Sequence, residues 1–294
     1  MGTKIKPNSG EVMQHSQTTM NGADIIVRVL ADEGISTLFG YSGGAILPTF
    51  DALFRYNKAN GDRDPMPIIV PANEQGATFM AAGYARASGK VGVAVVTSGP
   101  GATNCVTPVR DCMADSVPIV VICGQVGTTA IGTDAFQEAP VRGVMSSVAK
   151  HVYLVTDPKK LESTMRTAFE LARTGRPGPV VVDVPKDVQN WEGTYQGKGR
   201  LPILGYRYRL EAVNSNTLSK QKCKEFFSML AEAKRPLIYA GGGVINGNAS
   251  DALRELALTF KIPVTTTLMG LGGFDTKHPL SLHMLGMHGT AYAN

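Results

Sequence analysis

The sequence has few cysteines and no metal-binding pattern. Its four cysteines, among 294 residues, form no C-x-x-C pair and no spacing typical of zinc ligands, and its five histidines show no metal-ligand pattern either. Cys105 and Cys123 stand among small and apolar residues, where buried thiols are common. No disulfide is needed, so the sequence fits a reducing compartment. It predicts a cytoplasmic protein, with an organelle of a eukaryote as the alternative.

Long hydrophobic runs are also missing. No apolar stretch approaches the roughly 20 residues that a membrane-spanning helix needs, so we expect no membrane association. Residues 1–20 lack the hydrophobic core of a signal peptide, and they contain no arginine, which argues against an organellar transit peptide. We predict that this segment is a disordered lead-in.

A strong charge of one sign is absent as well. The net charge of +5 and the pI near 9.0 are mild, and a chain of this length and composition can form two domains. One basic and aromatic cluster could bind nucleic acid, but its irregular surroundings are typical of a solvated linker, so we expect no nucleic-acid partner. The cluster consists of Lys198, Arg200, Tyr206, Arg207, Tyr208 and Arg209.

The chain does contain a repeated alternation of short apolar runs and amphipathic stretches. We expect strands over 37–41, 66–70, 91–97, 118–124, 151–156 and 179–184. Helices are expected over 23–33, 45–56, 102–113 and 158–173, with a further one that opens at Glu74. Apolar runs such as 119–122 are continuous rather than alternating, which is typical of strands covered on both faces. The pattern predicts an α/β domain with a parallel sheet over residues 21–187.

A second α/β pattern follows a break in the periodicity. Residues 188–216 are rich in glycine and polar residues, and we interpret them as a linker. Residues 217–294 then predict an incomplete Rossmann-like domain of about three strands. Its expected helices lie at 218–233 and 248–260, its strands at 236–240 and 263–267, and a glycine turn at 241–243.

Glu74 stands at the opening of the helix that follows the second expected strand. Asn73 is a suitable N-cap, and a carboxylate in the first turn lies near the positive end of the helix dipole, where it stays ionised. Taken alone, a first-turn glutamate needs only this structural role. Small residues after it, including Gly76 and Ala77, also leave room for a ring.

Four stretches carry a more specific signal by their order along the chain. They are FGYSGGAILP at 39–48, PANEQGATFMAAGYAR at 71–86, TSGPGATN at 97–104 and GTDAFQE at 132–138. Together they resemble the pyrimidine-binding domain of thiamine-diphosphate enzymes, and most closely that of the large catalytic subunit of acetohydroxyacid (acetolactate) synthases. The resemblance runs from about Asn21 to the last residue. It implies a doubly wound pyrimidine-binding domain followed by a truncated Rossmann-like central domain.

The resemblance implies a thiamine diphosphate site. Glu74 matches the glutamate that hydrogen-bonds the pyrimidine N1′ and favours its imino form, so that the 4′-imino nitrogen can deprotonate the thiazolium C2. Other residues implied to contact or flank the cofactor are Tyr41, Gly43, Gly44, Pro100, Asn104 and Gln137. Gln137 and Lys186 are implied to act with Glu74 as catalytic residues. Phe136 and Gln137 are implied to line the reaction pocket and its entry channel, and Lys186 the substrate channel. Tight turns, a surface loop and a solvated lysine are the simpler interpretations of these residues.

The resemblance also implies FAD, held mainly for a structural role. Arg176 matches an arginine that binds the flavin phosphate, a role that suits a guanidinium fork. The other implied FAD contacts are Gly241, Gly242, Gly243, Thr267, Leu268, Leu285, Gly286, Met287, His288 and Gly289. Mg²⁺ is implied to bind in a C-terminal diphosphate-binding domain that this chain lacks. The cofactor would then lie between subunits of a homodimer or larger oligomer, with a regulatory small subunit as a further partner.

The implied reaction decarboxylates pyruvate on thiamine diphosphate and condenses the hydroxyethyl unit with a second 2-ketoacid, pyruvate or 2-ketobutyrate, in valine, leucine and isoleucine biosynthesis. We expect the fragment alone to be inactive. The alternatives are another thiamine-diphosphate carboligase or decarboxylase, and a non-catalytic FAD-binding paralogue. Three residues depart from the family's pattern: Asn73 stands where a histidine is usual, and Ser42 and Gly127 stand where prolines are usual.

Overall fold

The computed structural model describes residues 18–61, 65–197 and 219–294. The basic and aromatic cluster and most of the expected lead-in lie outside these residues. In the part of the chain that is described, no helix is both long and apolar enough to cross a membrane.

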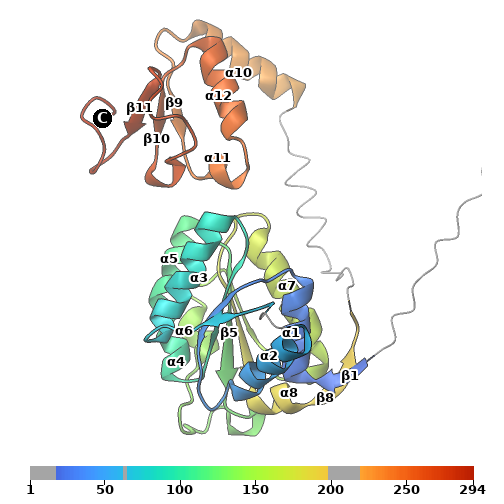
Figure 1. The fold of residues 1–294 in the computed structure, drawn as a ribbon. Helices are drawn as coiled ribbons and strands as arrows, with labels where there is room; N and C mark the ends of the chain where they lie inside the picture. Colours follow the sequence, from blue (N-terminus) through green and yellow to red (C-terminus); the bar gives the residue numbers. More distant parts are fainter. Residues whose placement is uncertain (1–17, 62–64, 198–218) are drawn as a thin grey trace, which may run out of the picture.

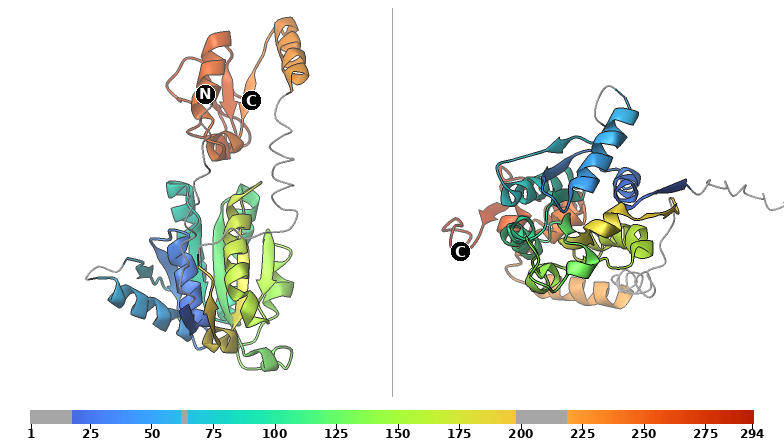
Figure 2. Two further views of the ribbon diagram at one scale, coloured as in Figure 1. Left: turned by 90° about the vertical axis from the view of Figure 1, so that its right-hand side faces the viewer. Right: turned by 90° about the horizontal axis from the view of Figure 1, so that it is seen from below.

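The first part is built on a six-stranded sheet with strand order β3-β2-β4-β5-β7-β6 (Figure 1). Every neighbouring pair is parallel, which confirms the predicted parallel sheet. The strands are β2 (Leu38–Tyr41), β3 (Ile68–Ile69), β4 (Gly92–Val96), β5 (Ile119–Gln125), β6 (His151–Leu154) and β7 (Val180–Pro185). All residues of β4, β5 and β7 are buried, because helices cover both faces (Figure 2).

Side chains that alternate along each strand enter two separate hydrophobic cores. Val120 and Ile122 of β5 join the core beneath α1 and α7, whereas Val121 and Cys123 join the core beneath α3 and α5. This is the doubly wound arrangement expected from the continuous apolar runs. The helices are α1 (Gly22–Asp32), α2 (Leu47–Ala59), α3 (Glu74–Ser88), α4 (Pro100–Thr103), α5 (Val106–Asp115), α6 (Val141–Met145) and α7 (Leu161–Arg173), with 3₁₀ turns η1 (Thr128–Ala130) and η2 (Pro158–Lys160).

Two expected elements are shorter or broken. The expected helix over 102–113 is divided into α4 and α5, with Asn104 and Cys105 between them. Pro108 lies in the first turn of α5, where its missing N–H removes no helical hydrogen bond, so it favours a new helix start at Val106. The expected strand over 66–70 is reduced to the two residues of β3 at the edge of the sheet.

Regular structure also extends into segments predicted to be irregular. Part of the expected linker forms α8 (Lys186–Asn190) and β8 (Glu192–Tyr195), and β8 pairs antiparallel with β1 (Thr18–Asn21) at the end of the expected lead-in. A buried ionic group fixes this pair of strands: Arg166 on α7 donates to Asp32 at 2.8 Å, to Glu162 at 3.0 Å and to the hydroxyl of Tyr195 at 3.0 Å.

The second part contains the expected α/β pattern. Its parallel sheet has the order β11-β10-β9, with β9 (Ile238–Ala240), β10 (Val264–Thr266) and β11 (Ser281–Met284). The helices are α10 (Lys220–Glu232), α11 (Gly243–Asn246) and α12 (Ser250–Phe260), with a 3₁₀ turn η3 (Leu268–Gly270). A small core, which includes Leu253, Ala257 and Phe274, joins α12 to the sheet.

Candidate functional site

The strand order of the first sheet places a topological switch between β2 and β4. From β2 the chain adds β3 on one side, then crosses to add β4 on the other. In open α/β sheets, ligands bind beyond the carboxyl ends of the strands at such a point. The loops after β2 and β4 meet closely here, since a Cβ on Gly43 would lie 2.6 Å from the side chain of Thr97.

Glu74 lies at this edge as the first residue of α3. The side chain of Asn73 accepts the N–H of Gly76 at 2.8 Å, which confirms the predicted N-cap. The helix start thereby holds Glu74 in a buried position, with 8% of its surface exposed. The Nδ2 of Asn104 donates to Oε2 of Glu74 at 2.8 Å, so the fold joins two residues that lie 30 positions apart.

Glycine lets the turn after β4 approach the Glu74 carboxylate closely. A Cβ on Gly101 would lie 3.2 Å from Oε1 of Glu74 and 2.6 Å from Thr97. Among the described residues, the buried hydroxyl of Thr97 has no hydrogen-bond partner. The oriented carboxylate of Glu74, the unpaired hydroxyl of Thr97 and the small residue Gly101 together suit the polar edge of a flat heteroaromatic ring. The predicted pyrimidine site requires such a set of groups.

The loop after β5 packs against the turn that follows β4. Gly99 has a φ of 56°, and a Cβ there would lie 2.5 Å from the carbonyl oxygen of Gln137. Gln137 also adopts a positive φ, of 58°. Within the loop, the carboxylate of Glu138 accepts hydrogen bonds from the N–H groups of Gly132 and Ala135. These bonds lower the pKa of Glu138, and the bond from Gly132 has the largest effect.

Sequence reasoning missed the anchoring role of Glu138. Its simpler interpretation of these residues was a surface loop. Both backbone N–H groups that Glu138 accepts lie close to it in the chain, three and six residues earlier. Phe136 is 88% exposed at the tip of this loop, where an uncovered aromatic ring can contact a ligand or another chain.

Lys186 is exposed at the carboxyl end of β7, as the first residue of α8. Its neighbour Asp187 accepts both the N–H of Thr128, at 3.0 Å, and the hydroxyl of Thr128, at 2.5 Å. These bonds tie the start of α8 to the loop after β5. Tyr41 ends β2, and Gly44 and Pro100 follow β2 and β4, so every predicted thiamine-site residue lies at this edge.

The predicted FAD residues divide between two places. Arg176 lies before β7, at the opposite edge of the first sheet. Its Nε donates to Ser116 at 2.8 Å, and its Nη2 donates to the carbonyls of Met113 and Ala114 at 2.8 and 2.9 Å. Arg176 therefore caps the carboxyl end of α5.

The other predicted FAD residues follow the strands of the second sheet. Gly241 and Gly242 come directly after β9, and Thr267 and Leu268 directly after β10. The buried hydroxyl of Thr266 has no partner among the described residues. Close to these turns, Gly243 begins α11, and the segment of Leu285, Gly286, Met287, His288 and Gly289 follows β11 at the same edge.

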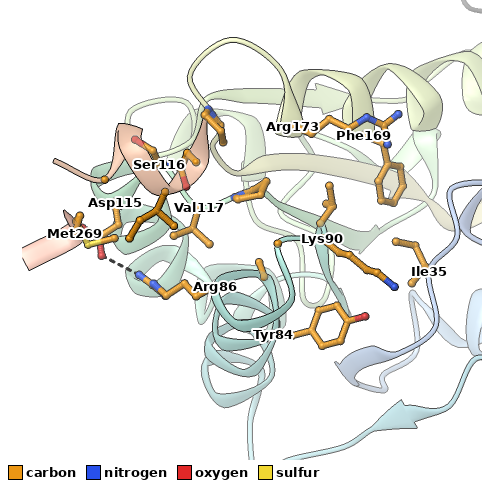
Figure 3. Close-up of a pocket in the computed structure, with 18 of the residues that line it drawn as sticks. Ile35, Tyr84, Arg86, Lys90, Asp115, Ser116, Val117, Phe169, Arg173 and Met269 are labelled. Atoms are coloured by element: carbon orange, nitrogen blue, oxygen red, sulfur yellow. Dashed lines mark hydrogen bonds and ion pairs between the residues drawn. The ribbon is translucent and has the colours of Figure 1, made fainter. Parts of the chain in front are cut away.

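A cavity of about 790 Å³ lies between the two parts (Figure 3). Gly242, Leu268 and Met269 line it from the second part. Arg176 is not a lining residue, but its partner Ser116 and its neighbour Pro177 are. Three further cations line the cavity that sequence reasoning missed: Arg86, Lys90 and Arg173. Arg86 is paired with Asp111 and Asp115.

Comparisons with known proteins agree with this geometry. Residues 20–144 match the family "Thiamine pyrophosphate enzyme, N-terminal TPP binding domain", and residues 223–294 match "Thiamine pyrophosphate enzyme, central domain". The acetolactate synthase large subunit of Corynebacterium glutamicum is 45% identical over 274 residues, which are 93% of this chain and 42% of that protein.

Two further relatives have similar identity. The mitochondrial acetolactate synthase catalytic subunit of Aspergillus candidus is 45% identical over 299 residues, covering 99% of this chain and 42% of the relative. The probable acetolactate synthase large subunit of Methanocaldococcus jannaschii is 46% identical over 278 residues, covering 94% and 45%. The chain spans less than half the length of these relatives.

Proposed function

Because the chain belongs to the thiamine pyrophosphate enzymes and is homologous to acetolactate synthase large subunits, we propose that it forms the pyrimidine-binding and central parts of an acetolactate synthase. The observation that carries the proposal is the buried Glu74 carboxylate at the β2–β4 switch point. It is hydrogen-bonded by Asn104 and lies next to Gly101.

In this proposal, the Glu74 carboxylate hydrogen-bonds the pyrimidine N1′, and Asn104 fixes the direction of the carboxylate. The bond from Asn104 occupies Oε2, which leaves Oε1 for the ring on the side of Gly101. When bound, thiamine diphosphate supplies the carbon nucleophile and the electron sink that decarboxylation of a 2-ketoacid needs. Gly43 and Gly101 let the turns after β2 and β4 pack closely at this site, because a Cβ at either residue would lie 2.6 Å from Thr97.

The proposed substrates are pyruvate and a second 2-ketoacid, pyruvate or 2-ketobutyrate. Lys186 provides an exposed cation at the same edge of the sheet, which suits an anionic carboxylate. Phe136 and Gln137 border the approach to the site on the loop that contacts the Gly99 turn. The products are 2-acetolactate or 2-aceto-2-hydroxybutyrate, precursors of the branched-chain amino acids.

The cavity between the two parts is the proposed place of FAD. Glycine turns after β9 and β10 and the cation of Lys90 offer the backbone and charge that a dinucleotide diphosphate needs. Mg²⁺ is proposed to bind with the thiamine diphosphate group on a further domain. A homodimer or larger oligomer then completes the site, with a regulatory small subunit as an additional partner.

The test is acetolactate formation from pyruvate by the natural protein with thiamine diphosphate, Mg²⁺ and FAD. Glu74→Gln keeps the shape of the side chain but removes its charge, so we expect a loss of about 10²- to 10⁴-fold in kcat, the usual effect of removing an acid–base group. Glu255→Gln, an exposed change on α12, serves as the control. Unchanged activity in Glu74→Gln contradicts the assigned role.

Two other outcomes separate the alternatives. A natural protein that binds FAD but forms no product from any 2-ketoacid supports the non-catalytic paralogue. A protein that forms a different condensation product supports another thiamine-diphosphate carboligase.

A further inference from the structure

A buried pair of side chains lies behind the candidate site and has no role in the chemistry described above. Asp183, in the middle of β7, is 1% exposed, and Gln125, the last residue of β5, is 2% exposed. The Nε2 of Gln125 donates to Oδ2 of Asp183 at 2.9 Å. The two residues are 58 positions apart, and neighbouring strands β5 and β7 bring them together.

The remaining groups of the Gln125 amide hold both ends of one loop. Its Oε1 accepts the N–H of Val126 at 2.9 Å, at the point where the chain leaves β5. Its Nε2 donates a second bond to the carbonyl of Ala139 at 3.1 Å, just before α6. One amide thus closes the loop over residues 126–139, and both of its donor hydrogens are used.

This loop contacts the candidate site directly. The carbonyl of Gln137 lies against Gly99, whose turn continues through Gly101 to Asn104. Asn104 in turn donates to the Glu74 carboxylate. Movement of the loop ends therefore changes the surface that faces the carboxylate.

We propose that Asp183 and Gln125 are positioning residues. The carboxyl group of Asp183 orients the Gln125 amide, which bonds both ends of loop 126–139 and thereby holds Gln137 against the Gly99 turn. We call this set of bonds the Gln125–Asp183 clasp. The proposal rests on the proposed function for its catalytic consequence, but the clasp itself is a property of the fold. A primary amide is required at position 125, because no other group of this shape donates two bonds and accepts one.

The surroundings of Asp183 support this role. Burial raises the pKa of Asp183 to about 7, against the opposing hydrogen bond from Gln125. The groups that face it from the adjoining strand are Gln125 and the buried thiol of Cys123, which is its register partner on β5. While Oδ2 of Asp183 is ionised it can only accept, so turning the Gln125 amide would place Oε1 of Gln125 against that oxygen.

The test measures loop protection by hydrogen exchange in the natural full-length protein, together with KM and kcat for pyruvate. Gln125→Glu keeps the shape but removes the donor to Ala139 and places two carboxyl groups together. We expect amides of residues 126–139 to exchange about tenfold faster, and KM to rise about fivefold with a smaller change in kcat, as the loss of one or two buried hydrogen bonds implies.

Three companion variants make the result decisive. Asp183→Asn retains an acceptor for Gln125 and should leave loop exchange near wild type. Asp183→Leu removes the acceptor and should accelerate exchange like Gln125→Glu, while Gln125→Met removes all the bonds without adding charge and provides a second test if Gln125→Glu does not fold. Gln221→Glu, on the exposed face of α10, is the control.

Loop exchange and KM at wild-type values in both Gln125 variants would overturn the proposal. Its failure is distinguishable from failure of the proposed function, because hydrogen exchange reports on the loop without turnover. Glu74→Gln is expected to lose activity while its loop remains protected.

Discussion

Glu74 and Asp183 are both buried carboxyl groups near one edge of the first sheet, yet their surroundings differ. Glu74 begins a helix, and its Oε2 is bonded to Asn104. Asp183 lies within a strand, and its Oδ1 has no partner among the described residues. The first environment suits a group that faces a ligand, and the second suits a group that is neutral over part of the physiological pH range.

The pKa of Asp183 leads to a prediction about stability. Burial raises it from 3.8 to about 7, so the folded protein keeps a proton that the unfolded chain releases above pH 4. Folding stability should therefore fall as the pH rises from about 4 to about 7. Between pH 5 and pH 8 the loss should be about 3 kcal/mol, from two pKa units at about 1.4 kcal/mol each.

Asp183→Asn removes this titration and should flatten the pH dependence by that amount. Denaturation curves of this chain at pH 5, 6, 7 and 8, followed by the fluorescence of Trp191, measure the difference. If the free energy of unfolding depends on pH equally in the wild-type protein and in Asp183→Asn, Asp183 does not titrate in this range.

At the scale of elements, the group around Arg166 joins α1, α7 and β8. Its guanidinium is 7% exposed and bonds to two carboxylates and to Tyr195. Tyr195 also donates to Asp32, and the N–H of Gln196 donates to Glu162 at 2.7 Å. This network explains why a segment with linker-like composition continues as an ordered strand.

We predict that Arg166→Met destabilises the chain by about 3–5 kcal/mol, because it leaves Asp32 and Glu162 without their cation. The matched control is Arg254→Met, which breaks an exposed pair with Asp251 and should cost less than about 1 kcal/mol. Thermal and urea unfolding of both variants measure the effect. Equal, small losses in the two would mean that the Arg166 network contributes little net stability.

At the scale of the whole molecule, the cavity is lined by both α/β parts. Its walls combine the amino edge of the first sheet, which includes Pro118 and Pro177, with the carboxyl edge of the second, which includes Gly242 and Leu268. A ligand bound there stabilises the arrangement of the two parts, by linkage to its binding free energy.

The proposed FAD site predicts that Leu268→Glu weakens FAD binding by tenfold or more, because a carboxylate in the cavity repels the dinucleotide diphosphate. Quenching of flavin fluorescence on titration with the natural protein measures the affinity. Met229→Glu, an exposed change on α10, is the control and should leave the affinity unchanged. Equal affinity in both variants would place FAD elsewhere.

Local patterns in the sequence predicted the elements that depend on nearby residues. The continuous apolar runs predicted buried parallel strands, and Asn73 predicted the start of α3, because burial on both faces and N-capping leave short-range signatures. The order of the four motifs predicted the family. A new helix start just before Pro108 was readable in principle, since proline lacks a donor and is tolerated in the first turn of a helix.

The tertiary structure alone decided which distant residues meet. The Glu74–Asn104 bond, the contact of Gly43 with Thr97 and the Gln125–Asp183 clasp join residues from separate strands and loops. The pairing of β1 with β8 is of the same kind. Each depends on the strand order and register of the fold, and no local periodicity encodes a contact between residues that only the closed sheet brings together.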